Sequence, residues 1–216
     1  MRIILARPRG FCAGVERAIG SVLQAVQRFG PPIYVLNHIV HNNHVVQSLA
    51  EKGVIFVKDL AEVPAFSTLL FSAHGVAPNL WEQAKERCLS IIDATCPLVE
   101  RVHREVTRYA RGGRTVIYIG DERHDEAIGA MGHAPGQIVA VKTLEDVERL
   151  EIRNPDQVAY VTQTTLSLED VSQIVTSLKQ RFPAIVGPNA GDICYATTNR
   201  QAALRHLGDD VDLVLV

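Results

Sequence analysis

Residues 96–101 read CPLVER, and they connect a short apolar run, SIIDA at 90–94, to a segment with apolar residues at helical spacing. The apolar run predicts a strand, and the spacing after it predicts a helix. Residues 12–17 read CAGVER, which shares the cysteine, valine, glutamate and arginine and again separates a strand-like run from a helical one. The two stretches therefore indicate one α/β unit used twice, with a cysteine at the same junction.

A looser copy of this junction, CYATTNR, occupies residues 194–200. Strand candidates alternate with helix candidates from RIILA at 2–6 to VDLVLV at 211–216, which predicts parallel sheets. We expect three similar α/β units with mainly parallel sheets. The first spans residues 14–96, the second 97–190, and a partial third 191–216, completed by a strand within 1–13. Thr143 with Asp146, and Ser167 with Asp170, predict helix capping boxes.

Composition excludes several classes of protein. The chain has 216 residues, a formal net charge of −2 and 47% hydrophobic residues, so it can bury a core but lacks the basic excess of a general nucleic-acid binder. No apolar run approaches the ~20 residues that span a bilayer. The N-terminus lacks the apolar stretch of a signal peptide. We therefore expect a cytoplasmic protein that binds neither membrane nor nucleic acid, in which the four cysteines form no disulfide framework.

Three of these cysteines, Cys12, Cys96 and Cys194, precede predicted helices. A helix N-terminus stabilises the thiolate, which is the form that binds metal. Iron–sulfur clusters are commonly held by four cysteines, so three would leave one iron open to water or substrate. Zinc held by three cysteines and a histidine is the competing metal site, and burial as a small hydrophobe is the ordinary role of a single cysteine. Cys88 ends a predicted helix, and we expect it to be a packing or surface residue.

Further polar residues follow predicted strands, where ligands of α/β sheets bind. His41, His74 and His124 are three of them, and each has a solvated or capping role as its ordinary alternative. Glu126 lies two residues beyond His124 and could relay protons. Thr164 belongs to a group of hydroxyl residues at a strand-to-helix junction, where capping is the alternative. The chain contains neither a Walker A motif nor a G-x-G-x-x-G motif, so an ordinary nucleotide site is not supported.

Taken together, these motifs resemble the LytB family of reductases. The resemblance is carried by six stretches: ARPRGFCAGVERAI at 6–19, HNNHVV at 41–46, FSAHGV at 71–76, DATCPLVERVH at 93–103, TQTTLS at 162–167 and DICYATTNRQ at 192–201. It implies that the three α/β units surround a central [4Fe–4S] cluster, one per chain. The cluster would be held by Cys12, Cys96 and Cys194, with one iron lacking a protein thiolate.

The resemblance also implies an activity. This is the reductive removal of the hydroxyl group of (E)-4-hydroxy-3-methylbut-2-enyl diphosphate, which yields isopentenyl and dimethylallyl diphosphate in the last step of the non-mevalonate isoprenoid pathway. Reduced ferredoxin or flavodoxin would donate the electrons. His41, His74, His124 and Thr164 would bind the substrate, and Glu126 would donate a proton.

Two departures from the family pattern are visible. Asp125 stands where the family usually has proline, and a carboxylate there is expected to raise the pKa of Glu126 and to weaken anion binding. The chain also ends at Val216, before a serine- and asparagine-containing segment that the family uses for the diphosphate, so we expect a C-terminally truncated third unit with little activity and poor solubility. A catalytically inactive iron–sulfur or zinc-binding remnant is therefore an alternative, and a cysteine hydrolase using Cys194 or Cys12 is a third.

Overall fold

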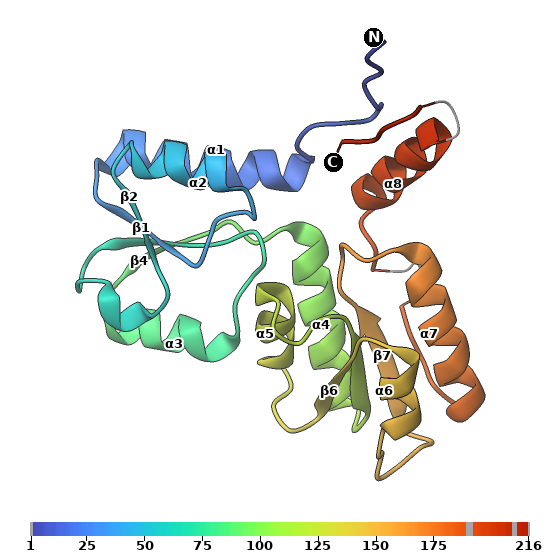
Figure 1. The fold of residues 1–216 in the computed structure, drawn as a ribbon. Helices are drawn as coiled ribbons and strands as arrows, with labels where there is room; N and C mark the ends of the chain where they lie inside the picture. The colour runs from blue at the N-terminus through green and yellow to red at the C-terminus, as the bar shows by residue number, and fades with distance from the viewer. Residues whose placement is uncertain (1, 189–191, 209–210, 216) are drawn as a thin grey trace.

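The computed structural model describes residues 2–188, 192–208 and 211–215, and it contains two parallel sheets, each lying between helices (Figure 1). The first sheet has the order β2-β1-β3-β4, and its strands are β1 (Ile33–Leu36), β2 (Val54–Val57), β3 (Thr68–Phe71) and β4 (Ser90–Asp93). Short apolar strands suit a parallel sheet because both faces of such a sheet are covered.

Helices cover both faces of the first sheet. Alternate residues of β1 point to opposite sides: Ile33 and Val35 pack with buried residues of α1 (Ala13–Phe29) and α2 (Asn43–Ala50). Tyr34 and Leu36 pack instead with α3 (Pro78–Glu86) and with η1 (Leu60–Glu62). Figure 1 shows α1 and α2 above this sheet and α3 below it.

The second sheet repeats this three-layer arrangement. Its order is β6-β5-β7, and its strands are β5 (Thr115–Ile119), β6 (Ile138–Val141) and β7 (Val158–Thr162). One face packs against α4 (Pro97–Arg111) and α5 (Asp125–Met131), and the other against α6 (Leu144–Arg149) and α7 (Leu168–Arg181). The two sheets lie within the first and second expected units, while the unit bounds themselves stay predictions.

The third unit differs from the expectation. Its helix, α8 (Tyr195–Gly208), is present, but residues 2–13 and the described residues 211–215 form no strand, so the predicted strands at 2–6 and 211–216 are wrong for the described part of the chain. The apolar run AIVG at 184–187, which has the composition of a strand, contributes one isolated bridge, between Val186 and Ala159. A strand needs a neighbour to accept its backbone hydrogen bonds, and here Ile3 and Leu213 remain about three-quarters exposed, at 74% and 75%.

The structure confirms one of the two predicted helix capping boxes. Pro78 begins α3, where its fixed backbone angle suits the first helical turn. Thr143 and Asp146 form the predicted capping box at the start of α6. Ser167 occupies the N-cap position of α7, but its side chain makes no capping hydrogen bond, so the second predicted capping box is wrong. Among the described residues, no helix is long and apolar enough to cross a membrane.

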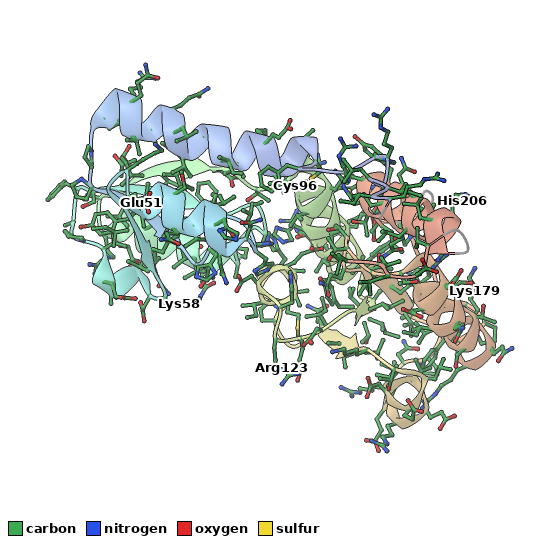
Figure 2. The ribbon with its side chains drawn as sticks, turned by 45° about the horizontal axis from the view of Figure 1, so that its top comes forward. Glu51, Lys58, Cys96, Arg123, Lys179 and His206 are labelled. Carbon is green, nitrogen blue, oxygen red and sulfur yellow. The ribbon has the colours of Figure 1, made fainter. Side chains whose placement is uncertain are left out.

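Each predicted site residue lies in a segment that follows the carboxyl end of a strand or that precedes or begins a helix. The first turns of α1, α4 and α8 face the same central region of the molecule (Figure 1). Figure 2 shows Cys96 there, at the start of α4 and beside the start of α1. Parallel strands place their carboxyl ends on one side of a sheet, where loops can converge on a ligand.

Candidate functional site

A cavity of about 360 Å³ lies where these loops converge. All eight residues that the sequence singled out for the site contribute to its lining: Cys12, His41, His74, Cys96, His124, Glu126, Thr164 and Cys194. They lie in segments that follow strands of both sheets and in the segments before α1 and α8, so the fold brings together residues that are distant in the chain.

Three of the lining residues form the cysteine trio, Cys12, Cys96 and Cys194. Cys12 is the N-cap of α1, where its Sγ accepts a hydrogen bond from the backbone N–H of Val15 at 3.5 Å. Cys96 is the N-cap of α4, and Cys194 immediately precedes α8. Each of the three thiols therefore lies at the N-terminal end of a helix, beside the backbone N–H groups of its first turn.

Gly14 shows how closely two of these thiols approach the same point. A Cβ atom at Gly14 would lie 3.0 Å from the Sγ atom of Cys96 and 3.8 Å from that of Cys12. The first distance is shorter than an ordinary van der Waals contact, so a larger residue would displace the sulfur. Cys88, the remaining cysteine of the described chain, is exposed and does not line the cavity. The donor set is thus three thiols without a fourth.

Two members of the trio are hydrogen-bonded in the same way to residues just beyond a strand, one strand in each sheet. The backbone N–H of Cys96 donates to the carbonyl of Ala73, just beyond β3, at 2.9 Å. The backbone N–H of Cys194 donates to the carbonyl of Thr164, just beyond β7, at 2.7 Å. These bonds place each cysteine beside a residue of the cavity wall. The two junctions are therefore similar in backbone hydrogen bonding as well as in sequence.

The histidine cluster comprises His41, His74 and His124, whose ring nitrogens lie within 4.8 Å of one another. The rings of His41 and His74 stack with a centroid distance of 4.2 Å. His124 Nδ1 accepts from the backbone N–H of Glu126 at 3.1 Å, so a neutral His124 carries its proton on Nε2. That Nε2 lies 3.1 Å from His41 Nε2, to which it can donate.

Two members of the histidine cluster, His74 and His124, have environments that favour the neutral ring when no anion is present. Burial, and then the neighbouring imidazoles, lower the pKa of His74 to about 3. Burial and His41 also lower the pKa of His124. Three imidazolium ions at these distances would repel one another strongly. A polyanion placed between them would reverse that balance, because it would favour the protonated rings.

Glu126 is the buried acid of the site, with only 2% of its surface exposed. Thr164 donates to both of its carboxyl oxygens, from the backbone N–H at 2.8 Å and from the hydroxyl at 2.9 Å. Burial outweighs these hydrogen bonds and raises the pKa of Glu126 to about 7. A carboxyl group that titrates near neutrality can hold a proton for transfer.

Asp125 plays another part than the sequence suggested. The charge that adds to burial in raising the pKa of Glu126 is Asp192, not Asp125. Asp125 occupies the first turn of α5, and its Oδ2 lies 3.9 Å from His74 Nδ1. Its carboxylate therefore lies beside the histidine cluster. There its volume and its negative charge oppose the binding of an anion.

The cavity wall also includes residues that the sequence did not single out, Asn42 and Arg200. Asn42 caps α2 through its side chain, at 3.0 Å from the backbone N–H of Val45. Its signal was the asparagine pair directly after His41, which is a typical helix start. Arg200 ends the third, looser copy of the cysteine junction, CYATTNR at 194–200. The sequence showed this arginine but did not predict what it contacts.

Comparison with known proteins places the whole chain within one family. The family model described as "LytB protein" matches residues 3–216. The 4-hydroxy-3-methylbut-2-enyl diphosphate reductases of Methylococcus capsulatus and Rhodopirellula baltica are 53% and 52% identical, and each alignment covers 100% of this chain and 70% and 68% of the relative.

A solved reductase structure from Plasmodium falciparum, described as acting on E-1-hydroxy-2-methyl-but-2-enyl-4-diphosphate, superimposes with a TM-score of 0.92 and 45% identity, over 95% of this chain and 65% of its own. A second solved structure, the reductase described as the terminal enzyme of the non-mevalonate pathway, gives a TM-score of 0.77 at 33% identity, over 97% and 74%. This chain thus spans about two thirds of the length of these proteins. With its fold, its motifs and its near-complete match to the family model, the chain belongs to the LytB family.

Proposed function

We propose that this chain carries out the reductive dehydroxylation of (E)-4-hydroxy-3-methylbut-2-enyl diphosphate to isopentenyl and dimethylallyl diphosphate. The observation that carries the proposal is the convergence of three thiols, three histidines and one buried carboxyl group on a single cavity. Each group matches a need of the reaction: a redox centre, a site for a diphosphate, and a proton donor for the departing hydroxyl group. Membership of the LytB family makes this combination the expected one.

The cysteine trio would hold one [4Fe–4S] cluster. The thiols suit it because all three line one cavity at helix N-termini, and because Gly14 leaves room between two of them. When bound, the cluster would supply the two electrons of the reduction and an iron without a protein thiolate. The protein's task is to hold the thiols apart at fixed positions and to exclude other ligands.

The histidine cluster would bind the diphosphate group. Neutral imidazoles that donate from one nitrogen can accept further protons when a polyanion arrives, so anion binding and proton uptake are coupled. His74 would change most, since its pKa in the free protein is about 3. Thr164 lines the same cavity, but both of its donors are engaged by Glu126, so it contributes mainly by orienting that carboxyl group.

Glu126 would deliver a proton to the leaving hydroxyl group. It is shielded from bulk water, and its pKa near 7 means that about half of the molecules carry the proton at neutral pH. The hydrogen bonds from Thr164 fix the orientation of the carboxyl group. The hydrogen bond from the Glu126 backbone N–H to His124 Nδ1 joins this residue to the histidine cluster.

Electrons would come from a reduced ferredoxin or flavodoxin. A cytoplasmic location is a further prediction, consistent with such donors.

Iron and sulfide analysis of anaerobically prepared protein tests the cofactor, and turnover of the allylic diphosphate with a chemical reductant tests the activity. The inactive-remnant alternative predicts a brown protein without turnover. Zinc in place of iron, or hydrolysis inhibited by thiol alkylation in metal-free protein, would overturn the proposal in favour of the other two alternatives.

A further inference from the structure

One arginine follows each cysteine of the trio by one to two helical turns, and each points at the segment that leads into another cysteine. Arg17, on α1, donates from Nη2 to the carbonyl of Thr95, the residue before Cys96. This contact links the helix that begins at one cysteine to the loop that presents the next.

The second and third arginines repeat this pattern. Arg101, on α4, has Nη2 4.0 Å from Oδ1 of Asp192, two residues before Cys194. Arg200, on α8, donates from Nε at 3.2 Å and from Nη2 at 2.7 Å to the carbonyl of Gly10, two residues before Cys12. The three contacts therefore close a cycle, from α1 to the Cys96 loop, from α4 to the Cys194 loop, and from α8 to the Cys12 loop.

The arginines meet acceptors that favour a fixed geometry. The Asp192 side chain is fully buried, and Glu105 holds the Arg101 guanidinium from the other side at 3.4 Å. Arg200 uses two donors on one carbonyl and a third, Nη1, on the carbonyl of Ala196 at 2.8 Å. A guanidinium presents several donors in one rigid plane, which suits such multiple contacts.

The contact made by Arg200 fixes the segment that has the fewest other restraints. Residues 2–11 form no strand, and Ile3 and Leu5 are largely exposed, so few packing contacts position the segment before Cys12. Figure 1 shows this segment and α8 on the same side of the molecule, away from both sheets. The Arg200–Gly10 contact joins them directly, at a point next to the cavity that both line.

We propose that Arg17, Arg101 and Arg200, here called the arginine ring, are positioning residues that hold the three cysteine-bearing loops at the mutual distances needed for a shared metal centre. Arg200 also lines the cavity, but in this scheme the role of all three arginines is to position the thiols. It acts through the backbone on either side of the thiols. The inference rests on the proposed function in one respect only, that the cysteine trio binds as a unit.

An ordinary surface role predicts something different. Most exposed ion pairs contribute little to stability or binding, so substituting arginines anywhere on these helices would then have similar small effects. The chain offers a matched control on each helix: Arg28 on α1, Arg104 on α4 and Arg205 on α8. All three are exposed, and none makes a described contact with a segment leading to a cysteine; Arg205 instead pairs with Glu169 at 2.6 Å.

Arsenite provides a test that needs no cluster. One As(OH)₃ condenses with three thiols to give As(SR)₃ and three waters, without a change of oxidation state, so its affinity reports how well three thiols converge. The protein would carry Cys88→Ser to remove the exposed thiol, and would be kept metal-free and reduced. Titration followed by mass spectrometry and by counting free thiols measures both stoichiometry and affinity. Circular dichroism and thermal melting identify any variant that fails to fold.

We expect Arg17→Ala and Arg200→Ala each to weaken three-thiol arsenite binding by about tenfold or more, in line with the loss of a charge-assisted hydrogen bond. Arg101→Ala should weaken it as well, because it removes the guanidinium 4.0 Å from the buried Asp192 carboxylate. Arg28→Ala, Arg104→Ala and Arg205→Ala should leave it unchanged. Lysine should restore most binding at Arg17, where one donor suffices, and less at Arg200, where two are used. The folded lysine variants keep the test decisive if an alanine variant does not fold.

The possible outcomes separate the two proposals. If the protein with the intact arginine ring binds no arsenite through three thiols, the shared metal centre of the proposed function fails. If that protein binds arsenite tightly and the ring variants bind as tightly, the positioning role is overturned while the metal centre stands. A uniform loss in ring and control variants would likewise overturn it, because general destabilisation would then explain the effect. In reconstituted protein, the ring variants should also lose iron faster to a chelator than the controls do.

Discussion

Replacing Glu126 by glutamine should make the metal-free protein more stable at high pH while removing most of its turnover. Glutamine is nearly isosteric, and its carbonyl can accept from the Thr164 N–H as Glu126 does, while its amide can donate to the Thr164 hydroxyl. The change therefore removes the titration and leaves the packing in place. An opposite effect on stability and on activity is the signature of a buried group kept for its chemistry.

The size of the stability effect follows from the pKa. Burial raises the pKa of Glu126 from its ordinary value of 4.5 to about 7, so the folded protein holds this proton more tightly than the unfolded chain does. The carboxyl group therefore costs stability as the pH rises above 4.5, and the cost is fully developed above about pH 7. At about 1.4 kcal/mol for each pH unit, the full cost is about 3 kcal/mol.

Denaturant unfolding of both proteins across this pH range measures the difference. The advantage of Glu126→Gln should be near its minimum at about pH 4.5, grow through neutrality and level off above about pH 7. Turnover of the reconstituted enzyme should fall by ~10²–10⁴-fold, as for loss of a general acid. The exposed Glu122, four residues earlier, gives the control Glu122→Gln, which should change neither quantity. A stability difference that does not vary with pH would refute the buried, raised-pKa account of Glu126.

Three further outcomes are expected. Changing any member of the cysteine trio to serine should lower bound iron and sulfide well below one cluster per chain, whereas Cys88→Ser should not; loss of the cluster in Cys88→Ser alone would contradict the assignment. Pyrophosphate should bind more tightly as the pH falls from about 8 to about 6, with proton uptake onto the histidine cluster, since a bound anion raises the lowered pKa of His74; calorimetry in two buffers of different ionisation enthalpy would show the uptake, and pH-independent binding would count against it. Asp125→Pro should keep or raise turnover in steady-state assays, because proline suits the first turn of α5 and because removal of a carboxylate 3.9 Å from His74 favours an anion there; a collapse of activity would mean that this carboxylate is needed.

The sequence was sufficient for those parts of the site that local patterns encode. A cysteine between a strand-like run and a helical run must stand at a helix N-terminus, and both Cys12 and Cys96 do. A histidine soon after a buried parallel strand must lie near the carboxyl edge of the sheet, and His74 and His124 were found there. The convergence of these residues follows from the parallel topology, which the alternation of elements predicted.

Contacts between distant segments were not predictable in this way. The apolar runs at 2–6 and 211–216 satisfy strand propensity, yet in the described residues neither has a hydrogen-bonding neighbour, and propensity alone does not form a strand. The acidic group closest in sequence to Glu126 is Asp125, but the helix directs that side chain to His74, while Asp192 approaches Glu126 from another segment. Which charge acts on which acid is decided by the tertiary fold, not by the spacing along the chain.

Thr164 illustrates how few residues join the redox and the proton chemistry of the proposed reaction. Its N–H and hydroxyl orient the carboxyl group of Glu126, and its carbonyl accepts from the backbone N–H of Cys194 at 2.7 Å. A shift of the Cys194 loop would therefore move the acid, because both are hydrogen-bonded to the same residue. Ala73 makes the equivalent backbone bond to Cys96 but has no side-chain donor, so of these two bonds the one at Thr164 links a cysteine to a titrating group. The repeated junction thus supplies the common scaffold for the thiols, and the residue placed after β7 distinguishes the unit that also holds the proton.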